Sequence, residues 1–131
     1  MVRSAVTFVS LCVLVTSVGP AAAESRAVAN GLEIHETAPI LDPTPPAHFL
    51  TKESCAAAQP GWKIDPTSIT TEVVTARMMD PGGDPDWKVE KAEGRTRVDN
   101  DGERVCMAAW CQGPFQFQCE IQIRASWREV R

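Results

Sequence analysis

The sequence contains no tyrosine and only two histidines, His35 and His48, among its 131 residues. It also lacks the H-E-x-x-H motif of zinc hydrolases, the G-x-S-x-G motif of serine hydrolases and a phosphate-binding glycine loop. Both histidines fall in or next to a proline-rich segment, where we expect them to be exposed and unrelated to each other. We therefore expect no metal site, no cofactor and no catalysis that depends on histidine.

The sequence also has no excess of basic residues. The chain carries 13 lysine and arginine residues against 17 aspartate and glutamate residues, a formal net charge of −4. Proteins that bind nucleic acids bring basic patches to the phosphate backbone, and anionic membranes attract basic segments. We therefore expect no nucleic-acid partner and no attraction to an anionic membrane.

The N-terminal apolar run is too short to cross a membrane. It covers residues 5–18, whereas a membrane-spanning helix needs roughly 20 apolar residues. Arg3 precedes the run, and an alanine triplet that ends at Ala23 follows it. This order predicts a secretory signal peptide over residues 1–23, cut after Ala23. We expect a protein secreted to the periplasm or the cell exterior, with no membrane anchor after cleavage.

Four cysteines remain after removal of the signal peptide, and an even number in a short exported chain indicates two disulfides. They are Cys55, Cys106, Cys111 and Cys119. If residues 106–111 form a regular strand, its ends lie roughly 16 Å apart, more than twice the ~7 Å that a disulfide allows between Cα atoms. This geometry disfavours a bridge between Cys106 and Cys111.

Two sets of disulfides remain open. We favour a bridge between Cys106 and Cys119, with the other two cysteines joined to each other. This set requires one β-bulge, because the two cysteines otherwise lie on opposite faces of neighbouring strands. The alternative joins Cys55 to Cys106 and leaves Cys111 to pair with Cys119. It requires residues 111–119 to form a wide loop instead of a tight turn.

The clearest pattern in the chain is an alternation from Phe115 to Trp127. Every odd position in this range is apolar or small and every even position is polar. A period of two is typical of a strand with one buried face and one exposed face.

Two turns extend this strand into a sheet. A hairpin turn at residues 101–102 would pair Val98 with Val105. A loop at residues 112–114 would in turn pair Val105 with Ile121. Because both registers join apolar positions to apolar positions, one apolar face would run across three strands.

A fourth strand and a helix complete the predicted fold. Residues 68–79 are rich in β-branched residues and form a strand with a bulge near Val73. Residues 51–59 contain three alanines and end at a Pro-Gly pair, which favours a short helix. The predicted fold class is α+β: a four-stranded antiparallel meander sheet, with the helix packed on its apolar face and two disulfides.

The prolines define the domain organisation. Residues 24–48 contain four of them and few large apolar residues, so we predict a Pro-rich extended or disordered arm. The disulfide-linked α+β domain would then cover residues 49–131.

The sequence has four tryptophans, and exposed tryptophans can stack on sugars or anchor a protein partner. Trp127 ends the apolar alternation and is expected in the core. Trp110 has the parity of the outer sheet face, and the predicted register brings Arg95 and Gln118 near it. These three residues are our candidate ligand-binding contact, and packing of Trp110 against the arm or the helix is the competing explanation.

No motif identifies a reaction. Our leading hypothesis is a small secreted, non-enzymatic protein that binds another macromolecule, as an accessory protein or an inhibitor. The second is a carbohydrate- or small-ligand-binding module that uses exposed tryptophan. The third is a hydrolase with a catalytic carboxylate pair. The expected partner is accordingly a protein or a glycan.

Overall fold

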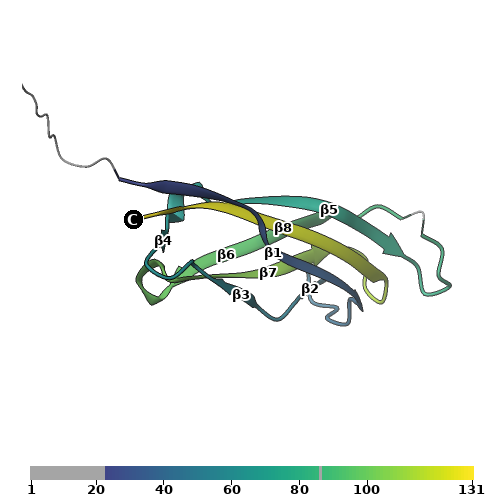
Figure 1. Ribbon diagram of the computed structural model, residues 1–131. Helices are drawn as coiled ribbons and strands as arrows, with labels where there is room; N and C mark the ends of the chain where they lie inside the picture. The colour runs from purple at the N-terminus through teal and green to yellow at the C-terminus, as the bar shows by residue number, and fades with distance from the viewer. Residues whose placement is uncertain (1–22, 86) are drawn as a thin grey trace, which may run out of the picture.

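The computed structural model describes residues 23–85 and 87–131, so the predicted signal peptide lies outside the described residues up to position 22. Two antiparallel sheets stack face to face (Figure 1). The first contains β1 (Ser25–Pro39), β4 (Lys63–Ile64), β5 (Thr70–Met79) and β8 (Gln118–Val130). The second contains β2 (His48–Leu50), β3 (Ser54–Ala57), β6 (Lys91–Asp99) and β7 (Arg104–Gln112).

Each sheet is built around one long central strand. In the first, β8 pairs with β1 along one side and with β4 and β5 along the other. In the second, β7 pairs with β6 along one side and with β2 and β3 along the other. The chain therefore passes back and forth between the two sheets. β6 and β7 form a hairpin, because they follow each other in the sequence and pair within one sheet.

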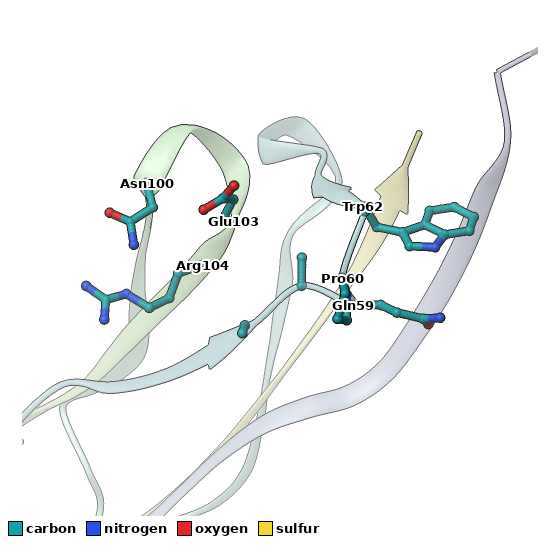
Figure 2. A pocket seen from close by; sticks show the side chains of 9 residues that line it. Gln59, Pro60, Trp62, Asn100, Glu103 and Arg104 are labelled. Carbon is teal, nitrogen blue, oxygen red and sulfur yellow. The ribbon is translucent and has the colours of Figure 1, made fainter.

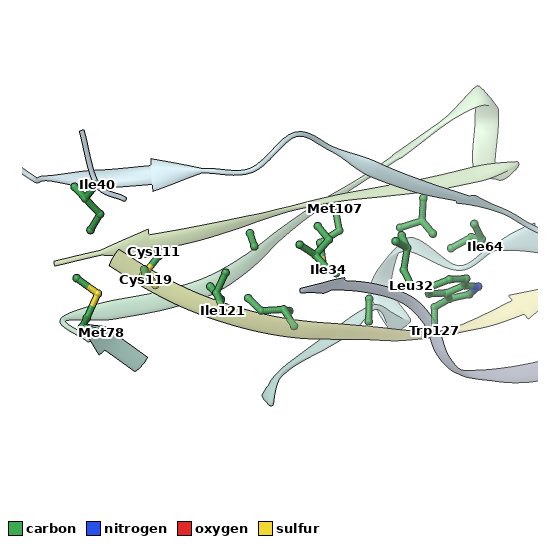
Figure 3. Close-up of a cluster of buried hydrophobic side chains, with 14 residues drawn as sticks. Leu32, Ile34, Ile40, Ile64, Met78, Met107, Cys111, Cys119, Ile121 and Trp127 are labelled. Carbon is green, nitrogen blue, oxygen red and sulfur yellow. A yellow bond between two sulfur atoms is a disulfide. The ribbon is translucent and has the colours of Figure 1, made fainter. Parts of the chain in front are cut away.

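The hydrophobic core lies between the sheets (Figure 3). The predicted alternation is confirmed in β8, where Cys119, Ile121, Ile123, Ala125 and Trp127 are buried. Odd positions of β7 face them, and Val105, Met107, Ala109 and Cys111 are fully buried. Because both central strands contribute a continuous apolar row, the core runs the length of the sandwich.

The predicted α+β class is wrong. Residues 54–57 of the proposed helix form strand β3, and the described residues contain no helix of seven or more residues. A nine-residue helix gains little from its alanines, because short helices are marginal without packing. Cys55 instead lies directly opposite Cys106 on β7, where a strand pairing and a disulfide are both available.

The segment predicted as a Pro-rich arm is largely a strand. Residues 25–39 form β1, which pairs with almost the whole of β8. Only Leu32 and Ile34 of this strand are buried, so its own sequence carries little of the alternation that identified β8. Its prolines follow the strand or end it, where the missing N–H groups cost no ladder hydrogen bond.

The predicted meander is correct for one hairpin and wrong for the other. Val98 pairs with Val105 as expected, and the bulge in β5 lies between Val73 and Thr75. The turn is longer than predicted, because Asn100, Asp101 and Gly102 all have positive φ. β7 and β8, in contrast, do not pair with each other, since residues 113–117 carry the chain from one sheet to the other.

The disulfides follow the alternative pairing, and the favoured set is wrong. Cys55 is bonded to Cys106 within one sheet, with 4.0 Å between their Cα atoms. Cys111 is bonded to Cys119 across the two sheets, with 6.7 Å between their Cα atoms. Cys106 is an even-numbered position of β7 and lies on the outer face of its sheet, so its bond to Cys55 needs no bulge. The loop between Cys111 and Cys119 is wide, as this set of disulfides requires.

Candidate functional site

Trp110 lies on the outer face of its sheet but is covered by its neighbours. The imidazole of His48 on β2 stacks on the indole, with ring centroids 4.0 Å apart and an interplanar angle of 18°. The guanidinium of Arg95 on β6 lies 3.9 Å from the indole centroid. Trp110 is only 9% exposed, so its rings are packed by β2 and β6 and offer little surface for stacking on a sugar.

The structure brings together two of the three predicted contact residues. Arg95 contacts Trp110, but Gln118 begins β8 in the other sheet. Gln118 lines a hollow of about 450 Å³ beside Asp80 and Gln116 instead. The prediction placed it near Trp110 because it assumed that β7 and β8 form a hairpin. The two histidines are also separated, since His35 on β1 bonds Glu120 on the outer face of the first sheet.

A groove of about 330 Å³ follows the outer face beside Arg95. Its lining residues are Leu50, Thr51, Glu53, Arg95, Thr96, Arg97 and Ala108. Arg97 donates two hydrogen bonds to Glu53, from Nε at 2.8 Å and from Nη2 at 2.7 Å. These bonds hold the pKa of the Glu53 carboxyl below its usual value. Arg95 in turn donates to Glu93 at 2.7 Å, so each charged side chain of the groove already has a partner of opposite charge.

A second hollow of about 290 Å³ lies near the chain termini (Figure 2). In Figure 2 Trp62 and Gln59 lie toward β1, while Asn100 and Arg104 line the opposite side. The guanidinium of Arg131 lies 4.5 Å from the centroid of the Trp62 ring. Its lining combines the segment that follows β3 with the turn between β6 and β7.

Large apolar side chains are exposed at the opposite end of the sandwich. Leu41 is 69% exposed, Trp87 49% and Phe115 43%. They lie on the loops that follow β1 and β5 and on the loop that joins β7 to β8. We call these three residues the apolar loop end.

Hydrogen bonds and a ring contact hold these loops beside each other. The backbone N–H of Ile40 donates to the carbonyl of Phe117 at 2.8 Å, and that of Gln116 donates to the carbonyl of Ile40 at 2.8 Å. The aromatic rings of Trp87 and Phe117 pack edge to face, with their centroids 5.3 Å apart. The three loops therefore form one surface.

The disulfide between Cys111 and Cys119 closes the central loop of this surface. Within that loop, the N–H of Gly113 donates to the carbonyl of Ala47 at 3.1 Å. A Cβ atom at Gly113 would meet the terminal methyl group of the buried Met78, so any larger residue here would require Met78 to move. Sequence analysis missed this surface because it placed Phe115 at the start of the alternating strand, on the buried face. The strand begins at Gln118 instead, and Phe115 is 43% exposed on the loop before it.

One group of side chains in the described part of the chain has the spacing of a metal site. It comprises Glu53, Cys55 and Cys106, whose potential ligand atoms lie within 4.8 Å of one another. Both sulfur atoms belong to the same disulfide, so neither is the thiolate that metals bind. The described residues also contain no helix long and apolar enough to span a bilayer.

Comparison with known proteins adds no functional assignment. No family model, no curated protein and no solved structure matches the chain.

Proposed function

We propose that this chain is an exported, disulfide-linked β-sandwich that binds a protein partner through the apolar loop end. The observation that carries the proposal is the exposure of Leu41, Trp87 and Phe115 on three loops held beside each other. Loops at one end of a rigid sandwich commonly carry binding residues. Exposed aromatic and aliphatic side chains on such loops are typical anchors of protein interfaces.

The charges near the anchors define the chemistry of the partner. Asp42 follows Leu41 directly, and Lys88 follows Trp87 directly. A complementary surface would offer an apolar pocket with charged residues of both signs at its rim. A glycan partner that stacks on Trp110 receives less support, because His48 and Arg95 already cover that indole.

Export is part of the same proposal. Two disulfides are stable in an oxidising compartment, and residues 1–23 have the composition of a signal peptide. We expect N-terminal sequencing of the protein purified from its native compartment to begin at Glu24. A mature chain that retains residues 1–23 would contradict this part of the proposal.

Substitutions at the apolar loop end test the binding role. The protein would be cross-linked to its neighbours in its native compartment, and the captured partner would then be titrated with purified variants. We expect Trp87→Ser and Phe115→Ser each to weaken binding by roughly tenfold or more, because buried aromatic anchors dominate interface energies.

The matched control is Leu50→Ser. Leu50 is similarly exposed, at 50%, but lies on strand β2 and lines the groove of the outer face. This variant should bind the partner as the unmodified protein does. Equal binding by all variants, or a loss specific to Leu50→Ser, would overturn the proposal.

A further inference from the structure

The two disulfides have different surroundings. Both cysteines of the Cys111–Cys119 bridge are fully buried between the sheets. The other bridge joins the fully buried Cys106 to Cys55, which is exposed on the four-residue edge strand β3. An attacking thiolate must reach a sulfur atom along the axis of the S–S bond, so access decides which bridge reacts first.

We propose that the Cys55–Cys106 disulfide is a thiol-exchange site, cleaved by a dithiol reductant while the sandwich remains folded. Attack takes place at Sγ of Cys55, the exposed cysteine of the pair. The S–S bond breaks, and its electron pair leaves on Sγ of Cys106. The second thiolate of the reductant then attacks the mixed disulfide at the reductant's own sulfur and releases Cys55. The dithiol is oxidised to a disulfide, and its two protons pass to the two cysteine thiolates.

Arg97 is placed to favour the first step. It lies directly opposite Cys106 in the pairing of β6 with β7. Its guanidinium is held by Glu53, whose carboxylate lies within 4.8 Å of both sulfur atoms. A nearby guanidinium lowers the pKa of a thiol, and a leaving thiolate of lower pKa departs faster. The Glu53 carboxylate by itself would oppose the leaving thiolate, and Arg97 offsets its charge through two hydrogen bonds. Arg97 is therefore a positioning residue that acts through Glu53 on the departure of Cys106.

Cleavage would release a defined segment. β3 is held to β7 by four residue pairs and by the disulfide. On one side of it, Thr51 remains anchored because its Oγ1 accepts a hydrogen bond from the N–H of Ala109 at 2.9 Å. On the other side, the N–H of Ala58 donates to the carbonyl of Glu103 at 2.8 Å, and the N–H of Gln59 donates to Glu129 at 3.1 Å. Residues 52–57 lie between these anchors and contribute to both the groove and the second hollow.

The test is partial reduction of the full oxidised protein with dithiothreitol in excess at neutral pH. Free thiols are trapped by alkylation at successive times and located by peptide mapping. We expect Cys55 and Cys106 to be labelled roughly tenfold faster than Cys111 and Cys119, because only the first bridge includes an exposed cysteine. Hydrogen exchange should rise within residues 52–57 and stay unchanged in β8. Earlier or simultaneous labelling of Cys111 and Cys119, or a rise in exchange throughout the protein, would overturn the proposal.

Two arginine variants separate the chemistry from general loosening of the sheet. Arg97 and Arg104 both bond Asp99, but only Arg97 also bonds Glu53 beside the bridge. Arg97→Gln should slow cleavage of the Cys55–Cys106 bridge by roughly two- to fivefold, because the Glu53 carboxylate beside the leaving thiolate loses its paired cation. Arg104→Gln should leave the rate unchanged. Equal rates in the two variants, or faster cleavage in Arg97→Gln, would remove Arg97 from the exchange step.

Discussion

Glu129 occupies an inward-facing position of β8 although it carries a charge. Its side chain is 2% exposed and accepts hydrogen bonds from Arg26 at 2.9 Å, from the indole N–H of Trp127 at 2.9 Å and from the backbone of Gln59 at 3.1 Å. The donors come from β1, from β8 and from the segment after β3. A buried carboxylate is tolerated only when such donors replace water, so this residue ties three parts of the sandwich together.

Removing the Glu129 carboxylate should destabilise the fold. We expect Glu129→Ala to lower the free energy of unfolding by about 3 kcal/mol, since it leaves buried donors without an acceptor. Urea unfolding followed by tryptophan fluorescence measures this change. Glu24→Ala removes the exposed partner of Arg131 and should change stability by less than about 0.5 kcal/mol. Similar losses in the two variants would contradict the assigned role of Glu129.

At the scale of the strand, the sequence predicts strands that carry a regular apolar alternation. It does not predict strands that form only because a neighbouring strand pairs with them. The alternation of β8 and the apolar register of the β6–β7 hairpin each follow from local residues, so both were predicted. β1 and β3 have weak patterns of their own and become strands because β8 and β7 supply partners. The contact of Arg95 with Trp110 follows from the predicted hairpin, whereas the place of Gln118 depends on a crossing between sheets. The apolar loop end was not predicted, because it depends on how three loops come together.

The ends of β6 and β7 carry an arginine–carboxylate cluster that makes stability depend on pH. Arg104 and then Arg97 donate hydrogen bonds to Asp99 and hold the pKa of its carboxyl below the ordinary value of 3.8. Because the folded pKa is the lower one, the carboxylate stabilises the fold above about pH 4, and this contribution is lost as the pH falls through the folded value.

Asp99→Asn should reduce this pH dependence. We expect the urea midpoint of the unmodified protein to fall more steeply between about pH 4 and pH 2 than that of the variant, because the variant has no carboxyl to protonate at this position. Parallel curves over this range would show that Asp99 does not contribute. The measurement at pH 7 gives the reference stability of each protein.

At the scale of the whole molecule, the Cys111–Cys119 bridge joins the two sheets at the end where the apolar residues are exposed. In Figure 3 it lies in the core close to Ile40 and Met78, which support the neighbouring loops. The bridge therefore connects the packing of the core to the arrangement of the proposed binding surface.

Replacing both Cys111 and Cys119 by alanine should affect stability and binding together. The loop between them is short, with a sequence separation of 8. Removing the bridge should lower the free energy of unfolding by about 2–3 kcal/mol, because the unfolded chain gains conformational entropy. We expect affinity for the partner of the apolar loop end to fall as well, because the loop is no longer held in its bound conformation. Calorimetric unfolding and the titration described above measure the two effects. Unchanged affinity in a destabilised variant would show that the bridge serves the fold alone.

The two ends of the described chain meet far from the apolar loop end. The backbone N–H of Glu24 donates to the carbonyl of Arg131 at 3.0 Å, and the reciprocal bond measures 3.1 Å. The 13 residues of β8 lead from Arg131 to the loops, and at ~3.3 Å per residue they span about 40 Å. A tag, a bead or a fused domain joined at either Glu24 or Arg131 would therefore sit at one end of the sandwich. It would leave Leu41, Trp87 and Phe115 accessible at the other end, in a fixed orientation.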